Sequence, residues 1–179
     1  SSSNEARRSA DIEWLKNWID IASKAGAERV RIIAGDADPT DQAALKRSGD
    51  ALQILCDYAT PRNVRIVTEN FRPLSYTAEN CLTLLKACGD RLGLTSDFGN
   101  FKGDNKFEEL TKTVPYSESI HAKAITNDEG YPNAAEFNQC MDIVKKSGYQ
   151  GPITIVYDGP NDLWDGIERV RALIEPYLG

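Results

Sequence analysis

The sequence predicts an α/β fold with parallel strands, of the (β/α)8-barrel type, in which this chain supplies about five of the eight strand-helix units. Three observations support this fold class. Short apolar runs alternate with amphipathic helical patterns, most runs end in polar residues, and the 179 residues are 41% hydrophobic. A chain of this length and composition can bury one core, so a single domain over residues 1–179 is expected.

The first helix is predicted over residues 11–24 and follows the polar segment SSSNEARRSA. Ile12, Leu15 and Ile19 recur there at three- and four-residue steps, and Gly26 ends the pattern. The run ERVRIIAG then predicts the first strand. After it, Thr40 or Asp41 is a candidate N-cap for a helix over residues 42–58.

The same alternation continues to the C-terminus. Strands are predicted for NVRIVTEN, RLGLTSDFGN, SESIHAKA and GPITIVYDG. Helices are predicted over residues 78–87, 105–111, 134–147 and 163–174. Strands that alternate with helices in this way are joined by crossover connections, which make neighbouring strands parallel.

Two parallel architectures are compatible with this order, the doubly wound sheet and the (β/α)8 barrel. The turn after the first strand reads GDADP and contains neither of the glycine-rich nucleotide motifs that doubly wound folds use. Polar residues stand instead at the ends of four strands: Glu69, Asp97, His121 and Asp158. Functional groups in a barrel come from the C-terminal ends of several strands, so the barrel is preferred.

A complete barrel needs eight units of about 25 to 30 residues each, so roughly three units are expected to precede residue 1. The chain would then be the C-terminal part of a barrel. Five parallel strands leave two unpaired edges, in RVRIIAG and ITIVYDG. We expect these edges to pair with another copy in a homo-oligomer or with a complementary chain.

The four strand-end residues have the chemistry of a metal site. They supply three carboxylates and the imidazole of His121, which is the only histidine in the chain. Oxygen and imidazole ligands suit a divalent cation, so Glu69, Asp97, His121 and Asp158 are candidate metal ligands.

The motifs also occur in a recognisable order. An Ala-Gly-containing helix before RVRIIAGD is followed by TEN, LGLTSDFGN, HAKA and SGYQGPITIVYDG. This succession resembles the later five-eighths of the xylose isomerase-like TIM barrels, the sugar phosphate isomerase and epimerase group. The resemblance implies a TIM-barrel-like fold and a divalent metal (Mn, Mg, Co or Zn) held by Glu69, Asp97, His121 and a second glutamate. Val156 stands where that glutamate would fall, and Asp158 on the same strand face is the candidate substitute.

The resemblance implies a metal-dependent sugar or sugar phosphate isomerase or epimerase that transfers a proton next to a carbonyl, with Glu69 as the base. Lys123, on the His121 face, and Arg31, on the first strand, are candidate substrate-binding residues. Because Val156 removes half of the acid/base pair, two alternatives stay open. The chain is a non-catalytic or truncated relative, or an engineered part-barrel that assembles through its open edges.

Charge and hydropathy exclude several other classes. The formal charge of −6 argues against a nucleic-acid partner. The apurinic endonuclease branch of the same superfamily binds three zinc ions with several histidines, so a chain with one histidine is not expected to belong to that branch. The sequence shows neither a membrane span of about 18 to 20 apolar residues nor a signal peptide, so a cytoplasmic protein with no membrane partner is expected.

Overall fold

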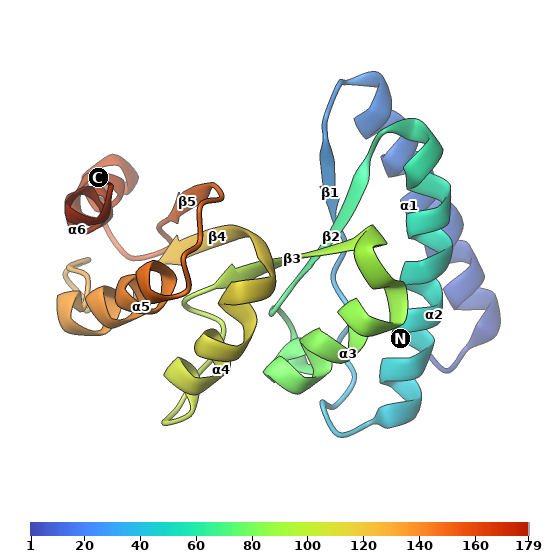
Figure 1. Ribbon diagram of the computed structural model, residues 1–179, viewed down its shortest axis with the longest axis horizontal. Coiled ribbons are helices and arrows are strands. Elements are labelled where there is room, and N and C mark those ends of the chain that lie inside the picture. Colours follow the sequence, from blue (N-terminus) through green and yellow to red (C-terminus); the bar gives the residue numbers. More distant parts are fainter. Residues whose placement is uncertain (179) are drawn as a thin grey trace. The chain divides into compact units, whose positions relative to one another are not determined.

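Strands and helices alternate along residues 1–178, the part of the chain that the computed structural model describes (Figure 1). The strands are β1 (Arg29–Arg31), β2 (Arg65–Glu69), β3 (Leu92–Asp97), β4 (Ser117–Lys123) and β5 (Ile153–Val156). The helices are α1 (Glu5–Lys24), α2 (Gln42–Ala59), α3 (Ala78–Cys88), α4 (Lys106–Thr113), α5 (Ala134–Lys146) and α6 (Leu163–Ile174). Short 3-10 helices cover Thr60–Arg62, Pro73–Ser75, Gly89–Arg91, Val114–Tyr116 and Glu175–Tyr177.

The five strands form one sheet in the order β1-β2-β3-β4-β5. β1 pairs with β2, and β4 with β5, in parallel register. Parallel strands that alternate with helices confirm the predicted incomplete (β/α)8 fold. The chain divides into two compact units, Ser1–Leu94 and Thr95–Gly179, so the single domain over residues 1–179 stays a prediction.

The first unit is organised around α2, which contacts α1, α3 and β2. Leu45, Leu52 and Leu55 recur on one face of α2 and are buried together with Ile66 of β2 and Ile19 of α1. Burial of this apolar face is the main stabilising term for the unit, because each buried aliphatic side chain contributes about 1.5 to 3 kcal/mol.

The second unit packs α4, α5 and α6 around a core of its own. Ile120 and Ala122 of β4 are fully buried in this core. Side chains alternate along a strand, so His121 and Lys123 emerge on the opposite face of β4. Lys123 lies in register with Val156 of β5, which therefore shares that face. Strand alternation thus separates the apolar core from the face that bears the candidate site residues.

The first helix begins at Glu5, so its predicted start at residue 11 is wrong. The Asn4 side chain accepts a hydrogen bond from the backbone N–H of Arg7 (3.0 Å), and this cap allows the polar opening to become helical. At the next helix the cap is Asp41, which accepts from the N–H of Ala44 (2.8 Å). None of the helices within residues 1–178 combines the length and apolar character that a bilayer crossing demands.

The first strand is shorter than predicted. Its ladder with β2 covers Arg29–Arg31, and one further hydrogen bond runs from the N–H of Ile32 to the carbonyl of Val67 (2.8 Å). Gly35, beyond the end of the ladder, has a φ of +133°, a conformation that L side chains rarely adopt. The predicted strand over residues 28–35 therefore extends too far.

Candidate metal centre

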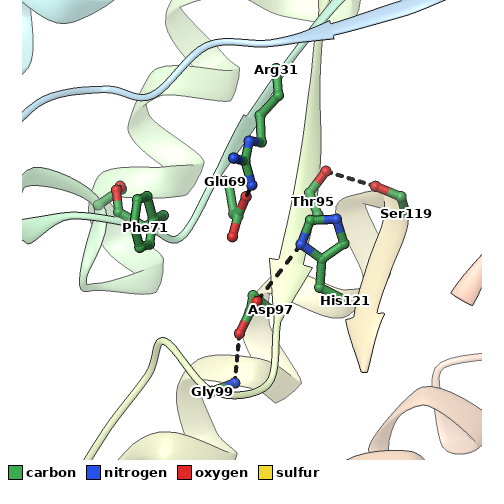
Figure 2. Close-up of polar contacts among 9 residues, drawn as sticks. Arg31, Glu69, Phe71, Thr95, Asp97, Gly99, Ser119 and His121 are labelled. Carbon is green, nitrogen blue, oxygen red and sulfur yellow. Dashed lines mark hydrogen bonds and ion pairs between the residues drawn. The ribbon is translucent and has the colours of Figure 1, made fainter. Parts of the chain in front are cut away.

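Asp97 ends β3, and its side chain is only 4% exposed. One carboxylate oxygen, Oδ1, accepts the backbone N–H of Gly99 (2.7 Å), as Figure 2 shows. Such a turn, in which an aspartate binds the amide two residues ahead, fixes the orientation of the carboxylate. Because a buried carboxylate is costly without compensation, a charge-bearing partner is expected beside it.

His121 of β4 provides a neighbour for that carboxylate. Its Nδ1 lies 3.7 Å from the second oxygen of Asp97, Oδ2 (Figure 2). This separation is too long for a hydrogen bond. Two ligands of one cation, each with a bond of about 2.0 to 2.2 Å, lie about 3 to 3.5 Å apart, so the pair is close to the spacing that a shared metal ion requires.

Two residues with hydroxyl side chains lie two positions before this pair on the same strands. Thr95 of β3 and Ser119 of β4 are joined by a hydrogen bond between their Oγ1 and Oγ atoms (2.6 Å; Figure 2). Sequence reasoning missed both residues, and it also missed Gly99. The two-residue alternation of a strand would have indicated the hydroxyls, because Thr95 precedes Asp97, and Ser119 precedes His121, by two positions.

Glu69 ends β2 in the first unit, and its side chain is 3% exposed. A guanidinium nitrogen of Arg31 donates a hydrogen bond to it, and the two residues form an ion pair. A charge-assisted contact of this kind holds the carboxylate in place and stabilises its negative charge. Arg31, predicted to bind substrate, thus contacts the predicted base, and its substrate role stays a prediction.

Lys123 and Asp158 form an ion pair in the second unit. The Asp158 side chain is 60% exposed, whereas that of Lys123 is 22% exposed. A Cβ at Gly99 would lie 2.8 Å from Cδ of Lys123. The aliphatic part of the Lys123 side chain can therefore take this position only because residue 99 is a glycine. The structure thus pairs Asp158 with Lys123. The role of Asp158 as a fourth metal ligand stays a prediction, and so does the role of Lys123 in substrate binding.

The residues present fit a divalent cation. The second unit supplies the buried carboxylate of Asp97 and the half-buried imidazole of His121, and the first unit supplies the buried carboxylate of Glu69. Oxygen and imidazole donors suit Mg, Mn, Co and Zn, whereas the absence of thiolates from the set disfavours softer metals.

Comparison with solved structures identifies proteins of the same fold. A xylose isomerase-like TIM barrel protein from Mycobacterium smegmatis, in complex with magnesium, is 18% identical, with a TM-score of 0.71 over 98% of this chain and 69% of that chain. A D-allulose 3-epimerase from Methylomonas sp. is 17% identical, with a TM-score of 0.76 over 99% of this chain and 72% of that chain. A D-tagatose 3-epimerase-like protein is 22% identical, with a TM-score of 0.71 over 99% of this chain and 72% of that chain.

A search of curated protein sequences gives no match. The family model of the xylose isomerase-like TIM barrels matches residues 1–175. That match covers nearly the whole chain and confirms the resemblance seen in the order of its motifs. The chain therefore belongs to the xylose isomerase-like TIM barrel family.

Proposed function

We propose that this chain carries the metal-binding and proton-transfer residues of a divalent-metal-dependent sugar, or sugar phosphate, isomerase or epimerase. The observation that supports this most strongly is the spacing of 3.7 Å between Nδ1 of His121 and Oδ2 of Asp97 at the ends of β4 and β3. The epimerases among its structural neighbours support the reaction class.

In this proposal Glu69, Asp97 and His121 hold the metal. A divalent cation bound there would polarise the carbonyl oxygen of the substrate and make the adjacent C–H bond more acidic. The magnesium complex of the Mycobacterium smegmatis protein supports a hard cation, and Mn, Co or Zn suits the same donors.

Glu69 is the proposed base. Its carboxylate would take a proton from the carbon next to the substrate carbonyl and return it to that carbon or its neighbour. The ion pair with Arg31 orients the carboxylate, and burial of Glu69 keeps water from competing for the proton.

Val156 has a consequence for the reaction type. Inversion at one carbon requires a base on one face of the substrate and an acid on the other, whereas a single base can return the proton on the same face. With Val156 in register with Lys123 and no carboxylate at position 156, the described residues favour proton transfer between neighbouring carbons. Aldose-ketose isomerisation therefore fits them better than epimerisation.

Proton exchange tests the proposed function. The chain loaded with Mn²⁺ is incubated with a ketose in D2O, and loss of the C–H signal next to the carbonyl is followed by NMR. We expect exchange in the parent chain and at least about a 100-fold loss in Glu69→Gln, which keeps the shape of the residue but removes the base. Thr111→Ala, exposed on α4, is the matched control. Exchange that survives in Glu69→Gln would contradict the assignment of the base.

A groove beside β1 favours the alternative in which copies of the chain assemble through their open strand edges. Its volume is about 410 Å³, and Trp14 and Trp18 of α1 and Val30 of β1 contribute to its lining. The Trp14 and Trp18 side chains are 60% and 48% exposed, an unusual exposure for residues of this size. A second copy of the chain that pairs with the edge of β1 would cover them.

Sedimentation velocity distinguishes this alternative. Self-association should raise the mean sedimentation coefficient with concentration, and Trp18→Glu should abolish the increase because it places a charge in the groove. Glu13→Gln, on the same helix, is the control. A monomer at every concentration would contradict assembly through this edge.

A further inference from the structure

The segment that follows β3 sets the orientation of Asp97. Residues 98–105 connect β3 to α4, and the backbone N–H of Gly99 donates to Oδ1 of Asp97 (2.7 Å; Figure 2). Phe98 donates its own backbone N–H to the carbonyl of His121 (3.1 Å). A shift of this segment would therefore move Asp97 relative to His121. A binding site tolerates only about 0.5 Å of such displacement, so the contacts that hold the segment bear on the proposed metal centre.

Two aromatic side chains anchor the first part of this segment. Phe98 and Phe101 are 1% and 2% exposed, and both belong to the core of the second unit. The ring of Phe98 packs edge-to-face against Phe137 of α5, with 5.8 Å between the ring centroids and 73° between the ring planes. Aromatic pairs favour this geometry, which fixes the place where the segment meets α5.

A buried ion pair anchors the other end of the segment. Lys106, the first residue of α4, pairs with Glu136 in the first turn of α5, and their side chains are 7% and 23% exposed. Lys106 is the one buried lysine among residues 1–178. Burial of a lysine is costly even when it is paired, and apolar residues of similar volume often stabilise a fold as well. A contact that fixes the position of α4 on α5 accounts for the two charges.

The first turn of α5 is also tied to the segment that follows β4. Residues 124–133 form that segment, and Asn133 ends it as the N-cap of α5. The Asn133 side chain accepts the backbone N–H of Glu136 (3.3 Å), and its own backbone N–H donates to the carbonyl of Ile125 (2.8 Å). Glu136 thus contacts the segment after β4 through Asn133 and the segment after β3 through Lys106.

We infer that Lys106 and Glu136 are positioning residues of the proposed metal centre. Their ion pair holds the segments after β3 and β4 against the first turn of α5, and it thereby sets the spacing between Asp97 and His121. The inference rests on the proposed function for the cation that these two ligands share. Every residue that carries it lies in the second unit, Thr95–Gly179.

Metal affinity tests the positioning role. Lys106→Met removes one charge and keeps the length of the side chain, and Glu136→Gln removes the other charge at nearly constant shape. We expect each to weaken Mn²⁺ binding about tenfold in calorimetric titration, as loss of a contact that orients a ligand does. Because both substitutions break one contact, the double variant should lose no more affinity than either single variant.

Lys112→Met is the matched control for this titration. Lys112 pairs with Glu108 on the same helix (2.7 Å), and both of these side chains are exposed. We expect this variant to bind Mn²⁺ like the parent chain. Parent-like affinity in both Lys106→Met and Glu136→Gln would overturn the inference. Glu136→Gln decides alone if Lys106→Met does not fold.

The imidazole signal gives a second readout that needs no metal. His121 is the only histidine in the chain, so a ¹³C-labelled sample without a histidine tag gives a single ring Hε1–Cε1 cross-peak. We expect this cross-peak, recorded without metal at one pH, to move or broaden in Lys106→Met and Glu136→Gln and to stay in place in Lys112→Met. A pair that only stabilises the fold would lower the urea midpoint and leave the cross-peak and the Mn²⁺ affinity unchanged, which would overturn the inference.

The two proposals fail in different ways. If the parent chain binds no Mn²⁺ while the His121 cross-peak responds to both substitutions, the proposed function is contradicted and the control of the Asp97–His121 spacing by the ion pair stands. If the parent chain binds Mn²⁺ and both single variants bind it equally well, the positioning role is contradicted and the proposed function stands.

Discussion

The imidazole Nδ1 of His121 and the carboxylate Oδ2 of Asp97 lie 3.7 Å apart at the ends of two strands in the second unit. The carboxylate is nearly fully buried, and its other oxygen is held by the Gly99 amide. A buried carboxylate that faces an imidazole at this distance is well suited to bind a cation, because the cation compensates the desolvated charge. The proposed metal chemistry depends on this relationship.

Restoring a carboxylate at position 156 should strengthen metal binding. Val156 of β5 lies in register with Lys123 of β4 and shares the sheet face that bears His121. We expect Val156→Glu to raise Mn²⁺ affinity about tenfold, because another oxygen ligand adds charge to the set. Isothermal titration calorimetry measures the change. Val156→Gln is the matched control, because it has nearly the same shape and no charge. Equal affinities in the two variants would argue against a ligand position at 156.

Acid should weaken the contact between α1 and the end of α2. Hydrogen bonds from Arg62 (2.6 Å) and Tyr58 (2.9 Å) lower the pKa of Asp20. A carboxyl with a lowered pKa in the folded state stabilises the fold above its unfolded pKa of about 3.9, and that stabilisation is lost as the pH falls through the folded value. Asp20→Asn should therefore lower the free energy of unfolding at pH 7 and change it little at the lowest pH.

Urea unfolding at a series of pH values checks this prediction. Asp50→Asn is the control, because Asp50 pairs with Lys46 on the exposed surface of α2. A difference between the parent chain and Asp20→Asn that stays constant down to pH 3 would show that the hydrogen bonds of Asp20 do not depend on its charge.

Truncation of the α2 core should destabilise the first unit. Leu52 is 2% exposed, whereas Ile54 on the same helix is 46% exposed. We expect Leu52→Ala to cost about 2 to 5 kcal/mol, through lost burial and the cavity that remains, and Ile54→Ala to cost less than about 1 kcal/mol. Urea unfolding followed by circular dichroism compares the two. Similar costs would mean that α2 does not use the predicted face for packing.

Much of the fold is visible in the sequence, because apolar periodicity reflects burial. β2 to β5 and the helices that follow them lie within a few residues of the predicted ranges. The start of α1 was missed because the Asn4 cap is a local hydrogen bond inside a polar segment that has no apolar period. The end of β1 was missed because Ile32, Ile33 and Ala34 continue the apolar run beyond Arg31, where the ladder with β2 ends.

The candidate site was predictable in its residue types and not in its contacts. The strand-end rule indicated Glu69, Asp97 and His121 because functional groups follow barrel strands. The ion pairs of Arg31 with Glu69 and of Lys123 with Asp158 depend on strand register and side-chain conformation. A one-dimensional pattern does not specify either, so Arg31 and Lys123 were assigned to substrate and Asp158 to the metal.

Calorimetric titration of the chain with Mn²⁺ tests the central claim most directly. We predict one ion per chain in the parent protein and at least about a 100-fold loss of affinity in His121→Ala, which removes the imidazole ligand. Thr111→Ala, exposed on α4, should bind like the parent chain. Absence of Mn²⁺ binding by the parent chain, or equal binding by His121→Ala, would contradict the metal site and the function proposed from it.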